Sequence, residues 1–248
     1  MRLPEMRGII ERRVLANFRL DPEAASLFLP DPFRPALVNG YAIAGICLIR
    51  LRAIRPSGLP AICGLRSENA AHRFAVEWDS PAGVRSGVYI PRRDTSSRIN
   101  SWVGGRLFPG IHQLATFETS DIDARISVAF EANDGSASAK VSGIVGEPFP
   151  GGSVFASLAE ASSFFEMGSI GYSATESPGV FDGLELRSHS WKVEPLMVDL
   201  VESSFFTDGT SLFAGTAEFD CALLMREIAH EWHAQEPLCC QDVASAAA

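Results

Sequence analysis

The sequence predicts an α+β fold in which β-strands dominate, and three observations support this prediction. Segments of alternating or continuous apolar residues recur along the chain at strand length. An Asp134-Gly135 pair separates two of these segments at hairpin spacing. Only two or three segments have helical spacing or a helix cap. The 248 residues contain no internal repeat and no long linker, so we expect one domain over residues 1–235 and a flexible tail over 236–248.

The N-terminal part of the chain predicts a short helix followed by a buried strand. Asp21 can cap the helix, Pro22 suits its first position, and Glu23 favours the positive end of the helix dipole. We expect the helix to end near Leu29. The run Tyr41–Ile49 is apolar on both faces, which predicts a buried central strand.

The middle of the chain predicts strands and one hairpin. Arg73–Trp78 alternates polar and apolar residues, and Arg85–Pro91 continues in the same style. Arg125–Phe130 also alternates, and Ala137–Val145 follows it after Asp134-Gly135. Because Asp-Gly readily adopts the positive φ angles of a tight turn, these two segments predict a hairpin.

The C-terminal part predicts two further helices and one strand. Ser153–Met167 has a broad apolar stripe, with Ser153 as its cap and Gly168 as its stop. A strand is expected at Gly183–Val193. Cys221–His233 has apolar residues at helical spacing and predicts a helix capped by Asp220, with a strand as the alternative.

Charge and apolar patterning exclude several classes of protein. The net charge of −9 disfavours nucleic acid and anionic membrane surfaces as partners. No run of 18 apolar residues predicts a membrane span, and the N-terminus is too charged for a signal peptide. We therefore expect a cytoplasmic protein.

The five cysteines are Cys47, Cys63, Cys221, Cys239 and Cys240. Their odd number, without C-x-x-C spacing, fits neither a disulfide framework nor a zinc site. Cys47 lies in an apolar run, where cysteine behaves as a small buried hydrophobe. The pair in the expected tail is assigned no role.

The cationic residues are two lysines, Lys140 and Lys192, against nineteen arginines. Both lysines fall on expected strands. One explanation of the imbalance is a GC-rich genome. The other is that some arginines grip carboxylates or phosphates through two parallel hydrogen bonds, which lysine cannot provide.

Several segments spread over the chain share one family resemblance. They are Arg12–Glu23, Asn39-Gly40-Tyr41 with Gly45, Gly87–Pro91, Gly104–Leu114, and Ala222–Arg226 with His230–Trp232. Together they resemble the uncharacterised YqjF-like family, a domain of unknown function that is similar in fold to acetoacetate decarboxylases. The resemblance implies a curved antiparallel sheet that closes into a cone around a small pocket, with two or three flanking helices.

The segment Gly104–Leu114 resembles the lysine motif of the decarboxylases but contains no lysine. Gly105-Arg106 matches the start of that motif and Gly110 its small residue. An ungapped alignment places Gln113 at the Schiff-base lysine, and a shift by one residue places His112 there. Neither side chain can form an iminium, so the resemblance implies a pocket without that chemistry.

Four side chains are candidates for the pocket besides Gln113. His112 can act as acid or base because imidazole titrates near neutral pH, or it can simply satisfy buried backbone groups. Arg106 can hold a substrate carboxylate or form a structural ion pair. Glu68 and Arg92 come from polar segments on either side of the Arg73–Trp78 strand and can contribute to ligand binding.

Glu227, His230 and His233 follow one another at a spacing of three residues. On a helix they would share a face, yet the complete di-iron and metalloprotease patterns are missing. We expect no metal and no cofactor.

Three hypotheses for function follow. The first is an enzyme for a small carbonyl or carboxylate compound that works without an imine, with His112 as acid or base and Arg106 as anchor. The second is a non-catalytic protein that binds a small molecule. The third is a structural role in a homo-oligomer.

Overall fold

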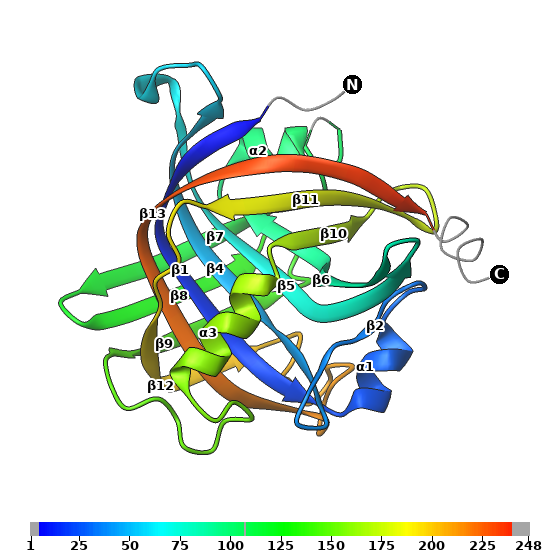
Figure 1. Cartoon of the computed structure of the whole chain (residues 1–248). Helices are drawn as coiled ribbons and strands as arrows, with labels where there is room; N and C mark the ends of the chain where they lie inside the picture. Colours follow the sequence, from blue (N-terminus) through cyan, green and yellow to red (C-terminus); the bar gives the residue numbers. More distant parts are fainter. Residues whose placement is uncertain (1–4, 107, 240–248) are drawn as a thin grey trace.

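The computed structural model describes residues 5–106 and 108–239, and thirteen strands form one curved sheet (Figure 1). Within this described part, three short α-helices flank the sheet, α1 (Pro22–Phe28), α2 (Arg98–Val103) and α3 (Leu158–Met167), together with a 3₁₀ turn at Ala61–Cys63. The strands are β1 (Met6–Leu20), β2 (Arg34–Pro35), β3 (Leu37–Val38), β4 (Tyr41–Pro56), β5 (Leu65–Ser80), β6 (Gly83–Thr95), β7 (His112–Ile122), β8 (Arg125–Ala132), β9 (Ser138–Val145), β10 (Ile170–Ala174), β11 (Val180–Ser188), β12 (Glu194–Ser203) and β13 (Ala217–Cys239). The predicted strand-dominated α+β class is confirmed.

The sheet closes on itself in two ways. Strand β6 pairs with β5, β7 and β10, while β13 pairs with β1, β11 and β12. The consecutive strands β13, β1, β4, β5 and β6 therefore belong to two rings. Strands β7, β8, β9 and β12 complete the first ring, and β10 and β11 complete the second ring.

The family resemblance implied an antiparallel sheet, but the observed sheet is mixed. The pairings of β6 with β7 and with β10 are parallel, and the other strand pairings are antiparallel. The β6–β7 pairing is parallel because α2 and the loop after it carry the chain back before β7 begins. Parallel neighbours require such a crossover connection.

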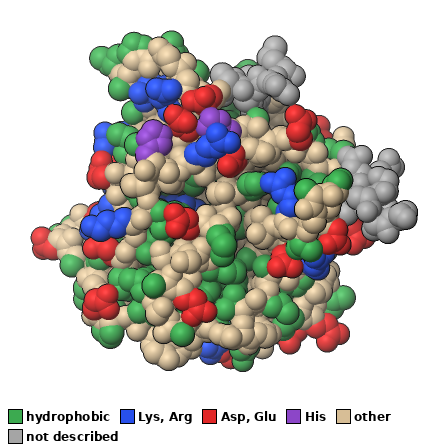
Figure 2. Space-filling view, in the orientation of Figure 1, with side chains coloured by type: hydrophobic (Ala, Val, Ile, Leu, Met, Phe, Trp, Pro, Cys, Tyr) green, Lys and Arg blue, Asp and Glu red, His purple; other side chains and the backbone are tan. Residues whose placement is uncertain are grey.

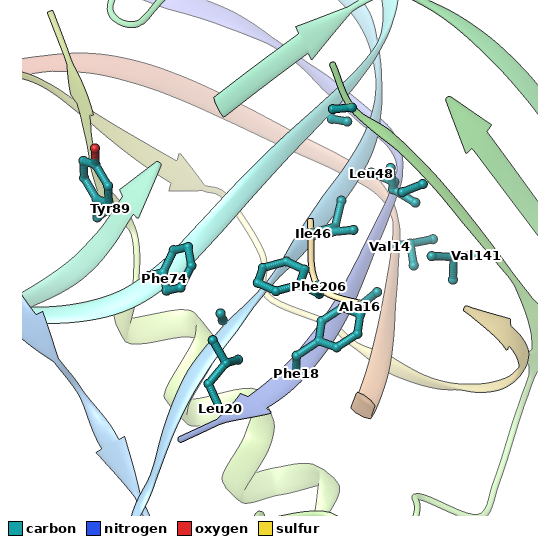
Figure 3. Close-up of a cluster of buried hydrophobic side chains, with 14 of the residues drawn as sticks. Val14, Ala16, Phe18, Leu20, Ile46, Leu48, Phe74, Tyr89, Val141 and Phe206 are labelled. Carbon is teal, nitrogen blue, oxygen red and sulfur yellow. The ribbon is translucent and has the colours of Figure 1, made fainter. Parts of the chain in front are cut away.

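The long shared strands present alternate side chains to the two rings. Val14, Ala16 and Phe18 of β1 point into the first ring and pack with residues such as Ile46 and Phe206 (Figure 3). The intervening residue Leu15 packs on the other side, in a cluster that includes side chains of α3. Both faces of these strands are buried, which is why the sequence shows continuous apolar runs here.

The expected N-terminal helix is confirmed as α1. The Asp21 carboxylate accepts hydrogen bonds from the backbone N–H groups of Glu23 and Ala24, at 2.9 and 3.0 Å. The central strand expected at Tyr41–Ile49 is confirmed as the first part of β4.

The remaining strands predicted in the middle of the chain are also confirmed. Arg73–Trp78 lies in β5 and Arg85–Pro91 in β6. The predicted hairpin is β8–β9, and Gly135 in its turn has a φ of +69°. This conformation is the left-handed one that glycine adopts at little cost.

The predicted cap of the long helix is wrong. Helix α3 begins after Ser157, whose hydroxyl accepts a hydrogen bond from the Glu160 N–H at 3.2 Å. Ser153 instead donates its hydroxyl to Asp220 at 2.6 Å, and Asp220 also accepts from the Val154 N–H at 2.8 Å. The polar residues that sequence reasoning read as two helix caps therefore bind each other across the fold.

The helix predicted at Cys221–His233 is wrong, and the alternative of a strand is confirmed. This segment lies in β13, where consecutive residues from Cys221 to Met225 are buried because the strand is shared by two rings. Glu227 has a φ of +50° and is left out of the pairs with β1, although the register is the same on both sides of it. Met225 and Ile228 pack in one cluster across this irregularity, and their spacing of three residues imitates that of a helix.

The strand expected at Gly183–Val193 is confirmed only for its first half, because β11 ends at Ser188. Lys192 therefore lies in a loop and not on a strand, whereas Lys140 lies on β9 as expected. Residues 236–239 continue β13, and residues 240–248, with Cys240, lie outside the described part. Over the described residues no helix is long and apolar enough to cross a membrane.

His72 on β5 is fully buried in the first ring, among Phe130, Phe205 and Phe206. Neither ring nitrogen has a hydrogen-bond partner within the described residues. Burial, reinforced by the positive charge of Arg92, lowers the pKa of His72 to about 3. The imidazole is therefore neutral in the folded protein and must gain a proton on acid unfolding.

We expect the His72→Phe variant to lose part of the acid sensitivity of the fold. The pKa of His72 is lower in the folded state than in the unfolded state, so its effect on stability appears as the pH falls below about 6.5. Each such proton steepens the fall in unfolding free energy by about 1.4 kcal/mol per pH unit. Urea unfolding between pH 7 and pH 4 measures this slope. An unchanged slope in His72→Phe would contradict the presence of a buried, neutral His72 in the folded protein.

Candidate functional site

A cavity of about 320 Å³ lies in the second ring, against the face of the shared strands that does not carry the Phe18–Phe206 core. This size suits a small-molecule ligand. The wall is mainly apolar, with side chains such as Ile49, Leu51, Ile90, Leu184 and Trp232. A smaller cavity of about 70 Å³ under α3 shares Arg13 and Arg73 with it.

Three arginines interrupt this apolar wall: Arg13 from β1, Arg73 from β5 and Arg93 from β6. Among the described residues, no aspartate, glutamate or lysine lines the cavity. None of the three arginines forms an ion pair with a carboxylate of the described residues. The cavity therefore carries concentrated positive charge without an acidic counter-ion of its own.

The partners of Arg13 and Arg73 are weak or neutral. Arg13 donates from Nε to the sulfur of Cys47 at 3.3 Å. Arg73 donates to the side-chain oxygen of Asn17, and its guanidinium lies 4.8 Å from the ring centre of Phe165. Its Nε is buried without a hydrogen-bond partner in the described chain. Burial lowers the pKa of Arg73 to about 10, which leaves the group fully charged at neutral pH.

Arg93 stands at the other side of the cavity. Its Nε donates to the hydroxyl of Ser173 at 3.2 Å, and burial lowers its pKa to about 10. Gly110 allows this approach, because a Cβ at this position would lie 2.8 Å from Arg93 Nε. Gly110 also has a φ of +81°, which a side chain would make unfavourable.

Helix α2 and the loop that leads to β7 form the remaining wall. Ile99 and Val103 of α2, Phe108 of the loop, and His112 at the start of β7 all line the cavity. The Nδ1 atom of His112 lies 2.9 Å from the carbonyl oxygen of Gly110. Because a carbonyl only accepts, Nδ1 carries the proton in this tautomer, and Nε2 keeps its lone pair.

His112 is held in place by its surroundings. A Cβ on Gly104 would lie 2.5 Å from His112 Nδ1, so glycine is required there for the ring to take this position. Burial, and secondarily the charge of Arg93, lowers the pKa of His112 to about 4. The imidazole is therefore neutral at physiological pH.

The structure separates the other candidates of the Gly104–Leu114 segment from the cavity wall. Arg106 is exposed and donates to the carbonyl of Trp102 at 2.6 Å. Gln113 is exposed, since it follows His112 on β7 and faces the opposite side. Leu107 lies outside the described residues. Only His112 of the two residues proposed for the lysine position lines the cavity.

Glu68 and Arg92 also lie outside the lining. Glu68 accepts hydrogen bonds from Arg50 and from the fully buried Arg12, the latter at 2.7 Å. Arg92 pairs with the buried Asp94 at 2.7 Å. Both side chains therefore have ion-pair partners within the fold.

The two lysines are exposed, and neither lines the cavity. The sequence reasoning missed Arg13, Arg73 and Cys47. Arg13 and Arg73 alternate with buried apolar residues, which is the usual pattern of a solvent-facing strand side. The available signal was the excess of arginine over lysine.

Glu227, His230 and His233 do not converge on one point, because β13 is a strand. Glu227 pairs with Arg52 at 2.7 Å, and His230 is buried. Of the described groups, Glu5, Glu231 and His233 come close enough to share an ion. Ion pairs with Arg7 and His189, and between Glu231 and His233, account for these three side chains. Figure 2 shows that histidines on the visible face lie among acidic and basic side chains.

A family model described as an uncharacterized conserved protein, DUF2071, matches residues 10–170. No match is found among curated proteins. The family match confirms the resemblance noted in the sequence.

Several solved structures are similar over nearly the whole chain. Acetoacetate decarboxylase from Legionella pneumophila has a TM-score of 0.62 at 8% identity, covering 95% of this chain and 88% of that one. The enduracididine biosynthesis enzyme MppR complexed with pyruvate has a TM-score of 0.60 at 13% identity, with coverages of 98% and 92%. An acetoacetate decarboxylase-like enzyme from Sphingomonas wittichii RW1 has a TM-score of 0.59 at 10% identity, with coverages of 95% and 92%. These likenesses confirm the acetoacetate decarboxylase-like fold.

We expect the Glu68→Gln variant to be destabilised by about 3 kcal/mol, because it leaves the buried Arg12 without its counter-charge. The measurement is the unfolding free energy from urea titration at pH 7. Glu118→Gln is a matched control on an exposed position of β7 and should stay within about 0.5 kcal/mol of wild type. Equal stability of the two variants would contradict the structural role of Glu68 and would leave ligand binding as its expected role.

Proposed function

The chain belongs to the DUF2071 family of uncharacterized conserved proteins, and from this premise we propose that its cavity binds a small, largely apolar carboxylate without forming an imine. One observation carries the proposal. Arg13, Arg73 and Arg93 line one cavity, and none of them has a carboxylate partner in the described chain.

The energetic argument concerns uncompensated charge. Placing a cation in a poorly hydrated interior without a counter-ion costs several kcal/mol. A bound anion would offset this cost at all three arginines. A carboxylate suits them well because its two oxygens match the fork of a guanidinium. The apolar side chains around the arginines would accommodate the rest of a small organic acid.

The comparison structures support the choice of ligand class. MppR has been solved as a complex with pyruvate, which is a small carboxylate with an adjacent carbonyl group. Pyruvate and acetoacetate are therefore suitable first probes for this cavity.

The chemistry that the cavity supports is proton transfer. An imine requires an amine, and both lysines are exposed and outside the lining. His112 is neutral and holds its Nδ1 proton on the Gly110 carbonyl, so Nε2 can accept a proton from a bound ligand. The product of that step would be an enolate next to arginine side chains, which stabilise developing negative charge.

We expect Arg93→Gln to weaken pyruvate binding by about 10- to 100-fold, the effect of losing one charge-assisted hydrogen bond. Isothermal titration calorimetry with pyruvate, acetoacetate and butyrate measures this change. Arg106→Gln is the matched control, and its binding should change by less than about 2-fold. The reverse order would place the anion at Arg106 and contradict the proposed cavity.

We expect the wild-type protein to exchange the methyl protons of pyruvate for deuterium in D₂O, and His112→Gln to lose this activity. Proton NMR at intervals measures the loss of methyl signal. Because the pKa of His112 is about 4, the free base predominates over the whole range from pH 6 to pH 8 and the rate should vary little there.

The exchange experiment also separates the two functional alternatives. Tight binding of pyruvate without exchange would favour a non-catalytic binding protein.

A separate experiment tests for an imine. Sodium borohydride added with pyruvate should leave the protein mass unchanged, and a reduced adduct on Lys140 or Lys192 would contradict the absence of an imine.

A further inference from the structure

Cys47 on β4 is a thiol in the wall of the cavity that the proposed proton transfer does not use. Its sulfur accepts the hydrogen bond from Arg13 Nε at 3.3 Å. The residue is 7% exposed, and that surface faces the cavity. The apolar run around Cys47 in the sequence suggested an inert buried side chain, but the structure gives it access to the ligand space.

The surroundings of this thiol are positively charged on several sides. Arg13 is in direct contact, and Cys47 is also close enough to Arg73 and Arg93 to interact electrostatically with both. The lining contributes no acidic side chain over the described residues. An anion attracted by these three arginines is therefore brought close to the Cys47 sulfur.

A second observation points to a ligand at this place. Arg73 is 6% exposed and lines the cavity, and its Nε has no partner in the described chain. A buried donor of this kind is costly to leave unpaired. A carboxylate bound at the Arg73 guanidinium would offset its buried charge and would lie beside Cys47.

The other three described cysteines lack this combination, since Cys63, Cys221 and Cys239 do not line the cavity. Cys63 is exposed at the surface in the 3₁₀ turn. Cys221 is fully buried, and burial raises its pKa to about 12, so it is inert. They are useful internal references for the reactivity of Cys47.

We propose that Cys47 is the nucleophile of this cavity, and that it takes small carboxylates whose neighbouring carbon is electrophilic, such as 2-oxo acids. This inference rests on the proposed binding of carboxylates. In the step, a bond forms between sulfur and the keto carbon, and the π electrons of the carbonyl move to its oxygen. The proton lost by the thiol ends on that oxygen. The product is a hemithioketal, formed reversibly and without oxidation or reduction.

Alkylation of the intact protein tests the inference with two probes that differ in charge. Iodoacetate and iodoacetamide both form a sulfur–carbon bond as the carbon–iodine bond breaks and iodide leaves. We expect the ratio of iodoacetate to iodoacetamide rates at Cys47 to exceed that at Cys63 by about tenfold or more, because the arginines concentrate the anion. Peptide mass spectrometry reads both sites in the same sample. Pyruvate should protect Cys47 and leave Cys63 unaffected.

Three controls make the result decisive. Arg93→Gln should lower the rate ratio at Cys47 towards that of Cys63. In the wild type, bound pyruvate labelled with ¹³C at C2 should show a new signal in the region of a saturated carbon. Cys47→Ser should lack that signal and still bind pyruvate in calorimetry.

If the wild-type protein does not bind carboxylates, the proposed function itself is wrong. Retained binding with equal rate ratios at Cys47 and Cys63, or with Cys47 unmodified, would overturn only the assignment of the nucleophile.

Discussion

Positive charge enclosed without an acidic partner is the constraint around which this molecule is organised. Arg13, Arg73 and Arg93 come from three different strands and reach one cavity, where the side chains that accept hydrogen bonds from them among the described residues are neutral. Holding them there requires a rigid frame, because a mobile guanidinium would turn towards water. The two-ring sheet provides that frame, since its shared strands are fixed by neighbours on both edges. The contrast with Arg12 is informative: this arginine is fully buried but is matched by Glu68, and it lies outside the cavity.

The same charge also decides which chemistry the cavity can support. A neutral imidazole at His112 and a thiol at Cys47 are both compatible with a positive environment, whereas a further amine would add to the repulsion. The two groups proposed to react are therefore compatible with the charge of the cavity. Fold likeness at such low identity fixes the frame, while the side chains in the cavity determine what is done there.

Much of the fold was predictable from local chemistry, and the failures have a common cause. The Asp21 cap and the Asp134-Gly135 turn act through neighbouring backbone groups, so a short window of sequence is enough to find them. The segment Cys221–His233 was read as a helix because β13 is buried on both sides and bends at Glu227. Arg73 was missed for a related reason, since polar residues that alternate with apolar ones normally face water. Here the second face of the strand borders a cavity, and only the pairing of distant strands reveals that.

Of the candidate site, the sequence located His112 through its glycine-rich segment but not the arginines around it. Gly104 and Gly110 are local signals, because their lack of a side chain makes room for His112 and Arg93. Arg106 is conspicuous in the same segment but exposed, and nothing in a single sequence separates it from Arg93.

The sharing of strands between two rings affects how this protein can evolve. On β5, His72 belongs to the aromatic core and the next residue, Arg73, belongs to the cavity. Any backbone change in the shared strands that reshapes the cavity therefore also changes the packing of the aromatic core on their other face. Helix α2 and the loop before β7 line the cavity but do not belong to the strands that the two rings share. Divergence towards new ligands should accordingly accumulate in helix α2 and this loop, while the strands beneath the cavity change slowly and keep their arginines.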